Sequence, residues 1–265
     1  FEALGLTEID MKKAIQCLNA YTTPPGSQSA FIHHGSPVPV QQYVWYDIWN
    51  KTQSREFLAY FYPRMKQYYE FLAGKSGSST TGILHSGLLK TWDYFYNSGG
   101  WDDYPPQKAV HDNRLENTVT PVITTAQCIR VAKMLRIAAA ALGLNHDVGD
   151  YDNDIALFGK ALQDYAWDET SGYFSYVVHD SLRNPAGVFR HPVSGQNYNM
   201  GLDGAYPLLS GICTEAQQEI LIRKIFSPGH MWTPAGICVV DREASYYRND
   251  GYWNGAVWMP HQWFM

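Results

Sequence analysis

Residues 121–143 read PVITTAQCIRVAKMLRIAAAALG, and this stretch is the strongest indication of the fold. A proline in the first turn and a glycine just beyond the end are typical of a complete helix, so the stretch predicts a helix from Pro121 to Leu142. Its alanine-rich end, around residues 137–144, is far shorter than a membrane-spanning segment. We therefore expect a long helix inside a globular protein.

Capping residues and apolar periodicity predict further helices on both sides of this one. They are expected from a Thr7–Asp10 capping box, from near Val38, from Ser54 to Gly74 with a kink or restart at Pro63, from a cap at Asp152 or Asn153, from a Thr214–Gln217 capping box, and from near Asn254. Strand signals are few, and residues 167–178 read as a turn with a short strand or small hairpin. Because no β-α-β alternation occurs, we expect an all-α array of antiparallel helices with long loops that build a site.

Composition narrows the function. The formal net charge of −5 gives no basic stripe for a nucleic acid, and no apolar run is long enough to anchor the chain in a membrane. The cysteines form no CxxC pair and the histidines no zinc motif, so we predict no metal and no cofactor. Aromatic residues make up 15% of the chain, with 9 Trp and 19 Tyr. Such rings stack on the apolar faces of sugars, although they also fill large helical cores.

Two adjacent carboxylates stand out in the octet SGGWDDYP, residues 98–105. Glycines before Trp101 and prolines after Tyr104 predict a shaped loop that holds Asp102 and Asp103 in place. An apolar pocket and a second carboxylate favour the protonated form of a carboxylic acid, which is what a general acid needs. An Asx-turn, with the acids capping backbone N–H groups, explains the same residues without any chemistry.

This loop, read as GWDDYP at residues 100–105, and the terminal motif YWNGAVW at residues 252–258 together resemble the paired motifs of glycoside hydrolase family 63. Residues 39–41 and the aromatic helix from Phe57 to Tyr68 are also similar to that family. The resemblance covers nearly the whole chain. It implies an (α/α)6 toroid with minor short strands, and we expect residues 1–265 to be a single barrel domain that is incomplete at both ends.

The resemblance also implies an inverting, exo-acting α-glycosidase of the α-glucosidase kind that hydrolyses terminal α-linked sugars. By position in the motif, Asp102 corresponds to the proton donor, and Asp103 to its brace or to a ligand of a sugar hydroxyl. The family's base carboxylate is expected beyond Met265, with Glu243 a weak substitute. Two positions depart from the family, because Asn254 and Pro106 stand where an arginine is usual.

Substrate contacts are expected from the two motifs and from loops at the same barrel mouth. The candidates are Gln41, Trp45, Trp92, Trp101, Asp103, Tyr104, Arg242, Tyr252, Trp253, Asn254, Gly255 and Trp258. For Trp45 the alternative is a place in the barrel core. Arg242 fits a bidentate clamp on the loop that carries Asp102 and Asp103 or a donor to a sugar hydroxyl, and an ordinary surface ion pair is the alternative.

Two other functions stay open. A partial barrel can bind glycans without turnover, and a trehalase-like enzyme of the same clan cleaves an α-linked disaccharide instead. In each case the partner is an oligosaccharide or disaccharide, together with the remaining segments of the barrel. The sequence does not fix the compartment, although a periplasmic or extracytoplasmic one is favoured.

Overall fold

A computed structural model describes residues 2–30, 38–90 and 101–264 of the chain. The helices in this part are α1 (Glu2–Thr7), α2 (Met11–Ala20), α3 (Val40–Thr52), α4 (Arg55–Leu72), α6 (Pro105–Asp112), α7 (Val122–Leu142), α8 (Asn145–Tyr165), α9 (Leu202–Ser210), α10 (Glu215–Ile225) and α11 (Met259–Phe264). Helices dominate, as the sequence predicts. No helix in the described residues is both long and apolar enough to cross a membrane.

The strands are short, two to four residues each, and form small separate sheets. They are β1 (Gly82–Ile83), β2 (Leu89–Lys90), β3 (Val119–Thr120), β4 (Trp167–Asp168), β5 (Tyr173–Phe174), β6 (Val177–His179), β7 (Pro185–Val188), β8 (Trp232–Thr233) and β9 (Gly236–Ile237). All pairs are antiparallel, and β3-β6-β7 forms a three-stranded sheet. The predicted hairpin at residues 167–178 is present as β4 and β5.

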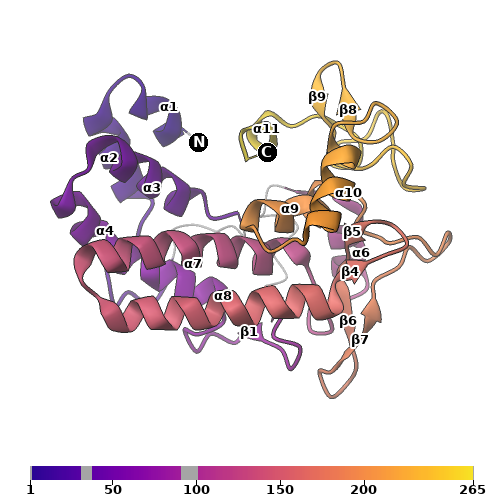
Figure 1. Ribbon diagram of the computed structural model, residues 1–265, viewed down its shortest axis with the longest axis horizontal. Helices are drawn as coiled ribbons and strands as arrows, with labels where there is room; N and C mark the ends of the chain where they lie inside the picture. The colour runs from indigo at the N-terminus through magenta and orange to yellow at the C-terminus, as the bar shows by residue number, and fades with distance from the viewer. Residues whose placement is uncertain (1, 31–37, 91–100, 265) are drawn as a thin grey trace.

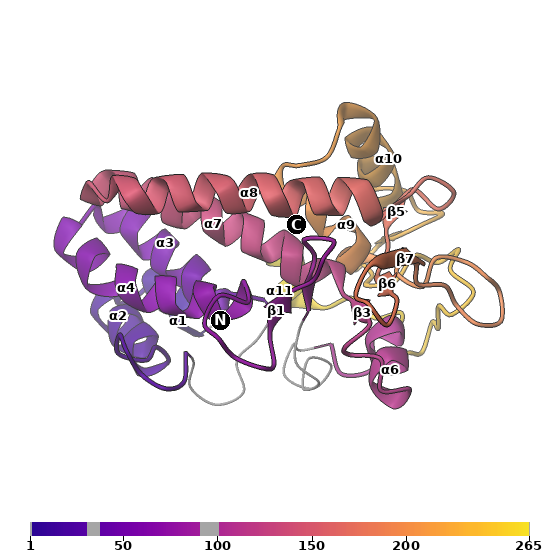
Figure 2. The ribbon, with the colours of Figure 1, turned by 90° about the horizontal axis from the view of Figure 1, so that it is seen from below.

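Helix α7 is the centre of the molecule. It lies antiparallel to α8, while α4, α9 and α3 pack on its other sides (Figures 1 and 2). Most of its first half is buried, including the polar Thr124, Thr125 and Gln127. Pro121 caps its start, and Gly143 ends it in the left-handed region at φ 82°, where its N–H bonds to the carbonyl of Ala139. The stretch that predicted the fold thus forms the central helix, on which α3, α4, α8 and α9 pack.

Local caps confirm some predicted helix boundaries. Ser54 Oγ accepts a hydrogen bond from the backbone N–H of Phe57 at 3.1 Å, and α4 continues through Pro63 without a restart. Thr214 and Gln217 form both bonds of a capping box at α10.

Other predicted boundaries are wrong. Thr7 ends α1, whereas Asp10 alone caps α2. Helix α8 begins at Asn145, so Asp152 and Asn153 lie inside it rather than at its cap. The last helix begins at Met259 instead of near Asn254, which lies in a turn. Helix α2 keeps the local cap at Asp10, whereas α8 begins without a side-chain cap and packs along α7.

Candidate functional site

Asp102 and Asp103, the two acids of the motif at residues 98–105, occupy the corners of a tight turn. The backbone N–H of Tyr104 donates to the carbonyl of Trp101 at 2.8 Å, which closes a four-residue turn with Asp102 and Asp103 in the middle. Trp101 and Tyr104 are fully buried, whereas both acids are partly exposed. The structure thus holds the pair in place, as predicted. Residues 98–100 of the same motif lie outside the described part.

The prolines act differently from the prediction. Pro105 and Pro106 are the first residues of α6 rather than part of a loop. At these positions the missing N–H is not needed by the helix and the fixed φ suits it. The turn at residues 101–104, called the acid turn below, therefore runs directly into α6.

The turn is joined to the terminal motif by one hydrogen bond. Asp103 Oδ1 accepts from the backbone N–H of Trp253 at 2.6 Å, although the two residues are 150 positions apart. A carboxylate that accepts from a backbone N–H gives a short, charge-assisted bond. Of the two roles predicted for Asp103, this contact supports the brace.

A cluster of aromatic rings lies behind this bond. The rings of Trp253 and Trp258 stack with centroids 4.3 Å apart, and Trp101 lies 5.3 Å from Trp253. The indole N–H groups of Trp101 and Trp253 are buried, and neither has a hydrogen-bond partner among the described residues. The surrounding aromatic rings therefore enclose both donors.

His261 completes the cluster, and sequence reasoning missed it. Its ring lies 4.5 Å from the ring of Trp101, and its Nδ1 lies 2.8 Å from the hydroxyl of Tyr206. Burial lowers the pKa of His261 to about 4, so the imidazole is neutral at neutral pH. The sequence contains no signal for this role, because a single histidine three residues after Trp258 has no characteristic spacing.

The rest of the terminal motif shapes the turn. Trp258 Nε1 donates to the carbonyl of Tyr252 at 3.0 Å, and the Tyr252 side chain is half exposed beside it. A Cβ on Gly255 would clash with the carbonyl oxygen of Arg248, so only glycine fits there. The carbonyl of Asn254 accepts from the N–H of Arg248 at 3.0 Å. Gly255 and the Asn254 backbone hold the loop, while Tyr252 faces solvent.

The candidate residues from the earlier part of the chain are Gln41, Trp45 and Trp92. Gln41 is half buried in the first turn of α3. Trp45 is fully buried in the core, which matches the alternative interpretation given for it. Its neighbour Gln42 is also fully buried, and neither atom of its amide has a partner within the described ranges. Trp92 lies outside the described residues.

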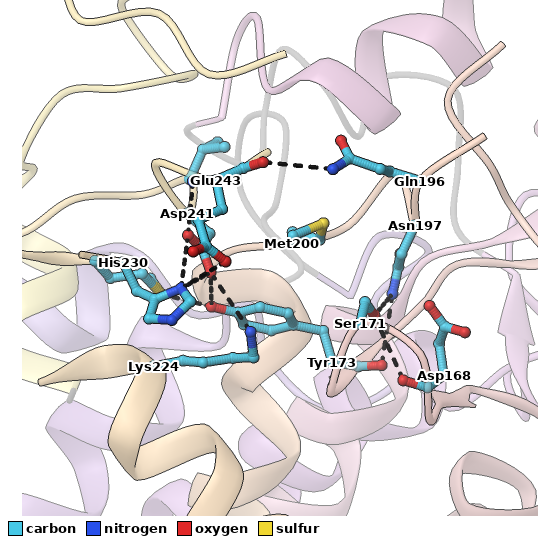
Figure 3. A network of polar contacts seen from close by, with 12 residues as sticks. Asp168, Ser171, Tyr173, Gln196, Asn197, Met200, Lys224, His230, Asp241 and Glu243 are labelled. Atoms are coloured by element: carbon cyan, nitrogen blue, oxygen red, sulfur yellow. Dashed lines mark hydrogen bonds and ion pairs between the residues drawn. The ribbon is translucent and has the colours of Figure 1, made fainter. Parts of the chain in front are cut away.

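A second polar network surrounds Asp241, and it contains Glu243 (Figure 3). Asp241 is fully buried and accepts from the hydroxyl of Tyr173 at 2.8 Å, while His230 Nδ1 lies 2.9 Å from its Oδ2. Glu243 Oε2 lies 3.4 Å from the same His230 nitrogen. These contacts give Glu243 a partner of its own within this network.

Arg242 lies beside this network. Its Nη1 donates to the carbonyl of Pro228 at 2.8 Å. In the described part of the chain its hydrogen bond thus goes to a backbone carbonyl, and the expected clamp on the acid turn is not formed.

His230, Asp241 and Glu243 also bring three potential metal ligands within 4.8 Å of one another. Lys224 opposes a cation there, because its ammonium group lies 3.9 Å from Asp241 Oδ2. Asp241 is moreover already hydrogen-bonded to Tyr173. We interpret His230, Asp241 and Glu243 as a structural network. Through Lys224 it connects α10 to the loops that follow.

A comparison with protein families matches residues 10–265 to the model described as "Mannosylglycerate hydrolase MGH1-like glycoside hydrolase domain". A search of curated proteins finds no match. Among solved structures, the chain is similar to the glycoside hydrolase family 63 mannosylglycerate hydrolase from Thermus thermophilus in complex with glucose, with 18% identity and a TM-score of 0.67 over 99% of this chain and 76% of that one.

The same hydrolase in complex with Tris and D-glycerate gives 17% identity and a TM-score of 0.66, over 99% of this chain and 77% of that one. A family 78 rhamnosidase from Bacillus sp. GL1 gives 16% identity and a TM-score of 0.58, over 85% of this chain and 21% of that one. At these identities the likeness shows the fold. The predicted all-α toroid with minor strands is confirmed.

Proposed function

Because this chain belongs to glycoside hydrolase family 63, through its mannosylglycerate hydrolase MGH1-like domain, we propose that it is an inverting, exo-acting α-glycosidase in which Asp102 is the general acid. The hydrogen bond from the Trp253 N–H to Asp103 is the observation that carries the proposal. This bond joins the motif at residues 100–105 to the motif at residues 252–258. It uses Asp103 as the acceptor, and Asp102 does not take part in it.

The geometry suits proton transfer to a leaving oxygen. Asp102 is partly exposed at the corner of a hydrogen-bonded turn, so its carboxyl can reach a glycosidic oxygen while its backbone stays fixed. Tyr252 and Trp258 give the same region exposed or half-buried aromatic surface for the sugar face.

Inversion also needs a base carboxylate that activates water on the opposite face of the ring, about 6.5–9.5 Å from the acid. We propose that this base lies beyond Met265 rather than at Glu243. The carboxylate of Glu243 pairs with His230 and lies next to the Asp241 network. We therefore expect Glu243→Gln to keep most of the activity.

For the substrate we propose an α-linked hexose on a small acidic aglycone, of the hexosylglycerate class. The family description and the D-glycerate bound to the Thermus hydrolase support this class. Terminal α-glucosides of oligosaccharides and α,α-trehalose are the alternatives. A panel of mannosylglycerate, glucosylglycerate, maltose, kojibiose and trehalose separates them by kcat/KM.

The acid is tested by replacing Asp102 with Asn in the complete protein. We expect kcat/KM on a preferred hexoside to fall by roughly 10²–10⁴, the usual contribution of general acid catalysis. On the matching α-glycosyl fluoride, whose leaving group needs no proton, we expect a much smaller loss. NMR should show the β-anomer as the first product of the wild-type protein.

Glu243→Gln serves as the matched control, since it removes a carboxylate charge without touching the acid turn. Near-wild-type activity of the Asp102 variant, or an equal loss on hexoside and fluoride, would overturn the assignment of Asp102. Sugar binding by the wild type with no release of product from any substrate would favour the non-catalytic binding function instead.

A further inference from the structure

A buried row of polar side chains leads from α9 to the acid turn. The hydroxyl of Tyr104 donates to Asn199 Oδ1 at 2.7 Å, and Asn199 Nδ2 donates to Asp203 Oδ1 at 3.4 Å. The hydroxyl of Tyr176 donates to Asp203 Oδ2 at 2.8 Å. Tyr104, Asn199 and Asp203 are each 0% exposed. The row therefore lies entirely inside the protein and ends two residues from Asp102.

This arrangement lowers the stability of the fold. A fully buried carboxylate is unfavourable unless a cation or several donors compensate its charge. The described partners of Asp203 are neutral groups, namely Tyr176, Asn199 and the backbone of Ile123, and burial raises the pKa of Asp203 to about 7. An apolar residue of similar volume at this position would pack without that penalty, so packing alone does not explain an aspartate.

The carboxyl group has a geometric effect on its neighbour. An amide side chain can sit in either of two orientations, and its hydrogen-bond partners decide between them. Asn199 Nδ2 faces two acceptors, Asp203 Oδ1 and the carbonyl of Phe174 at 3.0 Å. That orientation turns Asn199 Oδ1 towards Tyr104, whose hydroxyl then has an acceptor.

Tyr104 in turn is the last residue of the acid turn, because its N–H closes the turn onto Trp101. If its ring shifts, the closing bond and the Asp102 backbone shift with it. A displacement of about 1 Å at a catalytic group can lower a rate by roughly 10².

We propose that Asp203 is a positioning residue for the glycosidase reaction, which acts through Asn199 and Tyr104 to fix the general acid Asp102. The inference rests on the proposed function of Asp102. It requires that loss of the row impair proton donation to the leaving group while sugar binding stays largely intact.

The test compares two leaving groups in the complete protein carrying Asp203→Leu, Asp203→Asn or Tyr104→Phe. We expect Asp203→Leu to lower kcat on a hexoside ten- to a hundredfold with little change in KM, and to lower kcat on the α-glycosyl fluoride less than threefold. Asp203→Asn, which keeps hydrogen-bonding groups, should recover most of the loss. Tyr104→Phe removes only the hydroxyl and should reproduce the selectivity for the poor leaving group, even if Asp203→Leu fails to fold.

Asp154→Asn is the control, because Asp154 is also buried and hydrogen-bonded but lies in α8 and pairs with Tyr69 and Lys75. It should lower stability without any dependence on the leaving group. If Asp102→Asn discriminates between the leaving groups but the Asp203 and Tyr104 variants do not, the positioning role is wrong. If Asp102→Asn itself does not discriminate, the proposed function fails first.

Discussion

Two buried groups near the site should make stability depend on pH in opposite directions. Burial lowers the pKa of His261 from 6.5 to about 4 and raises the pKa of Asp203 from 3.8 to about 7. Their variants His261→Gln and Asp203→Asn remove one titration each, and both replacements can still hydrogen-bond. The two groups change the free energy of unfolding in opposite directions over nearly the same pH range, so their contributions largely cancel in the wild type.

The sign follows from proton uptake. Between pH 6.5 and 4 the unfolded chain protonates His261 and the folded one does not, so this contribution is complete above pH 6.5 and is lost as pH falls. Each pKa unit corresponds to about 1.4 kcal/mol, which makes the loss about 3 kcal/mol by pH 4. For Asp203 the folded state holds the proton more tightly, so its contribution is present below pH 3.8 and about 4 kcal/mol is lost as pH rises to 7.

Between pH 4 and 6.5 the two slopes oppose each other, at about 1.4 kcal/mol per pH unit each. Urea unfolding at half-unit steps from about pH 4 to 7 measures the free energy of unfolding for the wild type and each variant. Relative to the wild type, Asp203→Asn should gain stability as pH rises, and His261→Gln should gain stability as pH falls. Differences that stay flat with pH, or slopes of the reverse sign, would refute the reasoning. NMR titration of the His261 imidazole gives an independent check.

Three further predictions concern the acid turn and the terminal motif. Asp103→Ala leaves the Trp253 N–H without its acceptor and should cost about 1.5–3 kcal/mol in urea unfolding and lower kcat, whereas Asp103→Asn should cost less. Gly255→Ala forces a Cβ against the carbonyl of Arg248 and should destabilise by about 3 kcal/mol, measured as a lower Tm. Trp258→Ala removes the ring stacked on Trp253 and should raise KM more than it lowers kcat, which steady-state kinetics on the preferred hexoside will show.

The sequence predicts those parts of the fold that carry their own local signal. Helix α7 has a proline at its start and a glycine at its end, and α10 has both members of a capping box, so their limits can be read directly. Helix α8 begins at Asn145 with no side-chain cap, because its packing along α7 stabilises it instead. A helix defined by tertiary contacts cannot be located from capping residues.

The candidate site also contains residues that carry a local sequence signal and residues that only the three-dimensional structure reveals. Asp102 and Asp103 are recognisable because they adjoin glycine, tryptophan and proline in a short motif. The bond between Asp103 and Trp253 spans 150 positions, and no spacing rule connects residues that far apart. Asp203 looks in the sequence like one more acid in an apolar stretch, and only the structure shows it buried among neutral donors.

The division of tasks that we propose for the two adjacent acids starts from their consecutive places in one turn. Successive corner side chains point in different directions, so a group that bonds one cannot easily bond the other. The Trp253 N–H already occupies an oxygen of Asp103, which suits the bracing role of that residue. We therefore propose Asp102, rather than Asp103, as the general acid, while Asp103 and the buried row through Tyr104 hold the turn from two sides. This proposal rests on the geometry of the turn together with the resemblance of the motif, and the Asp102→Asn experiment tests it without knowledge of the base.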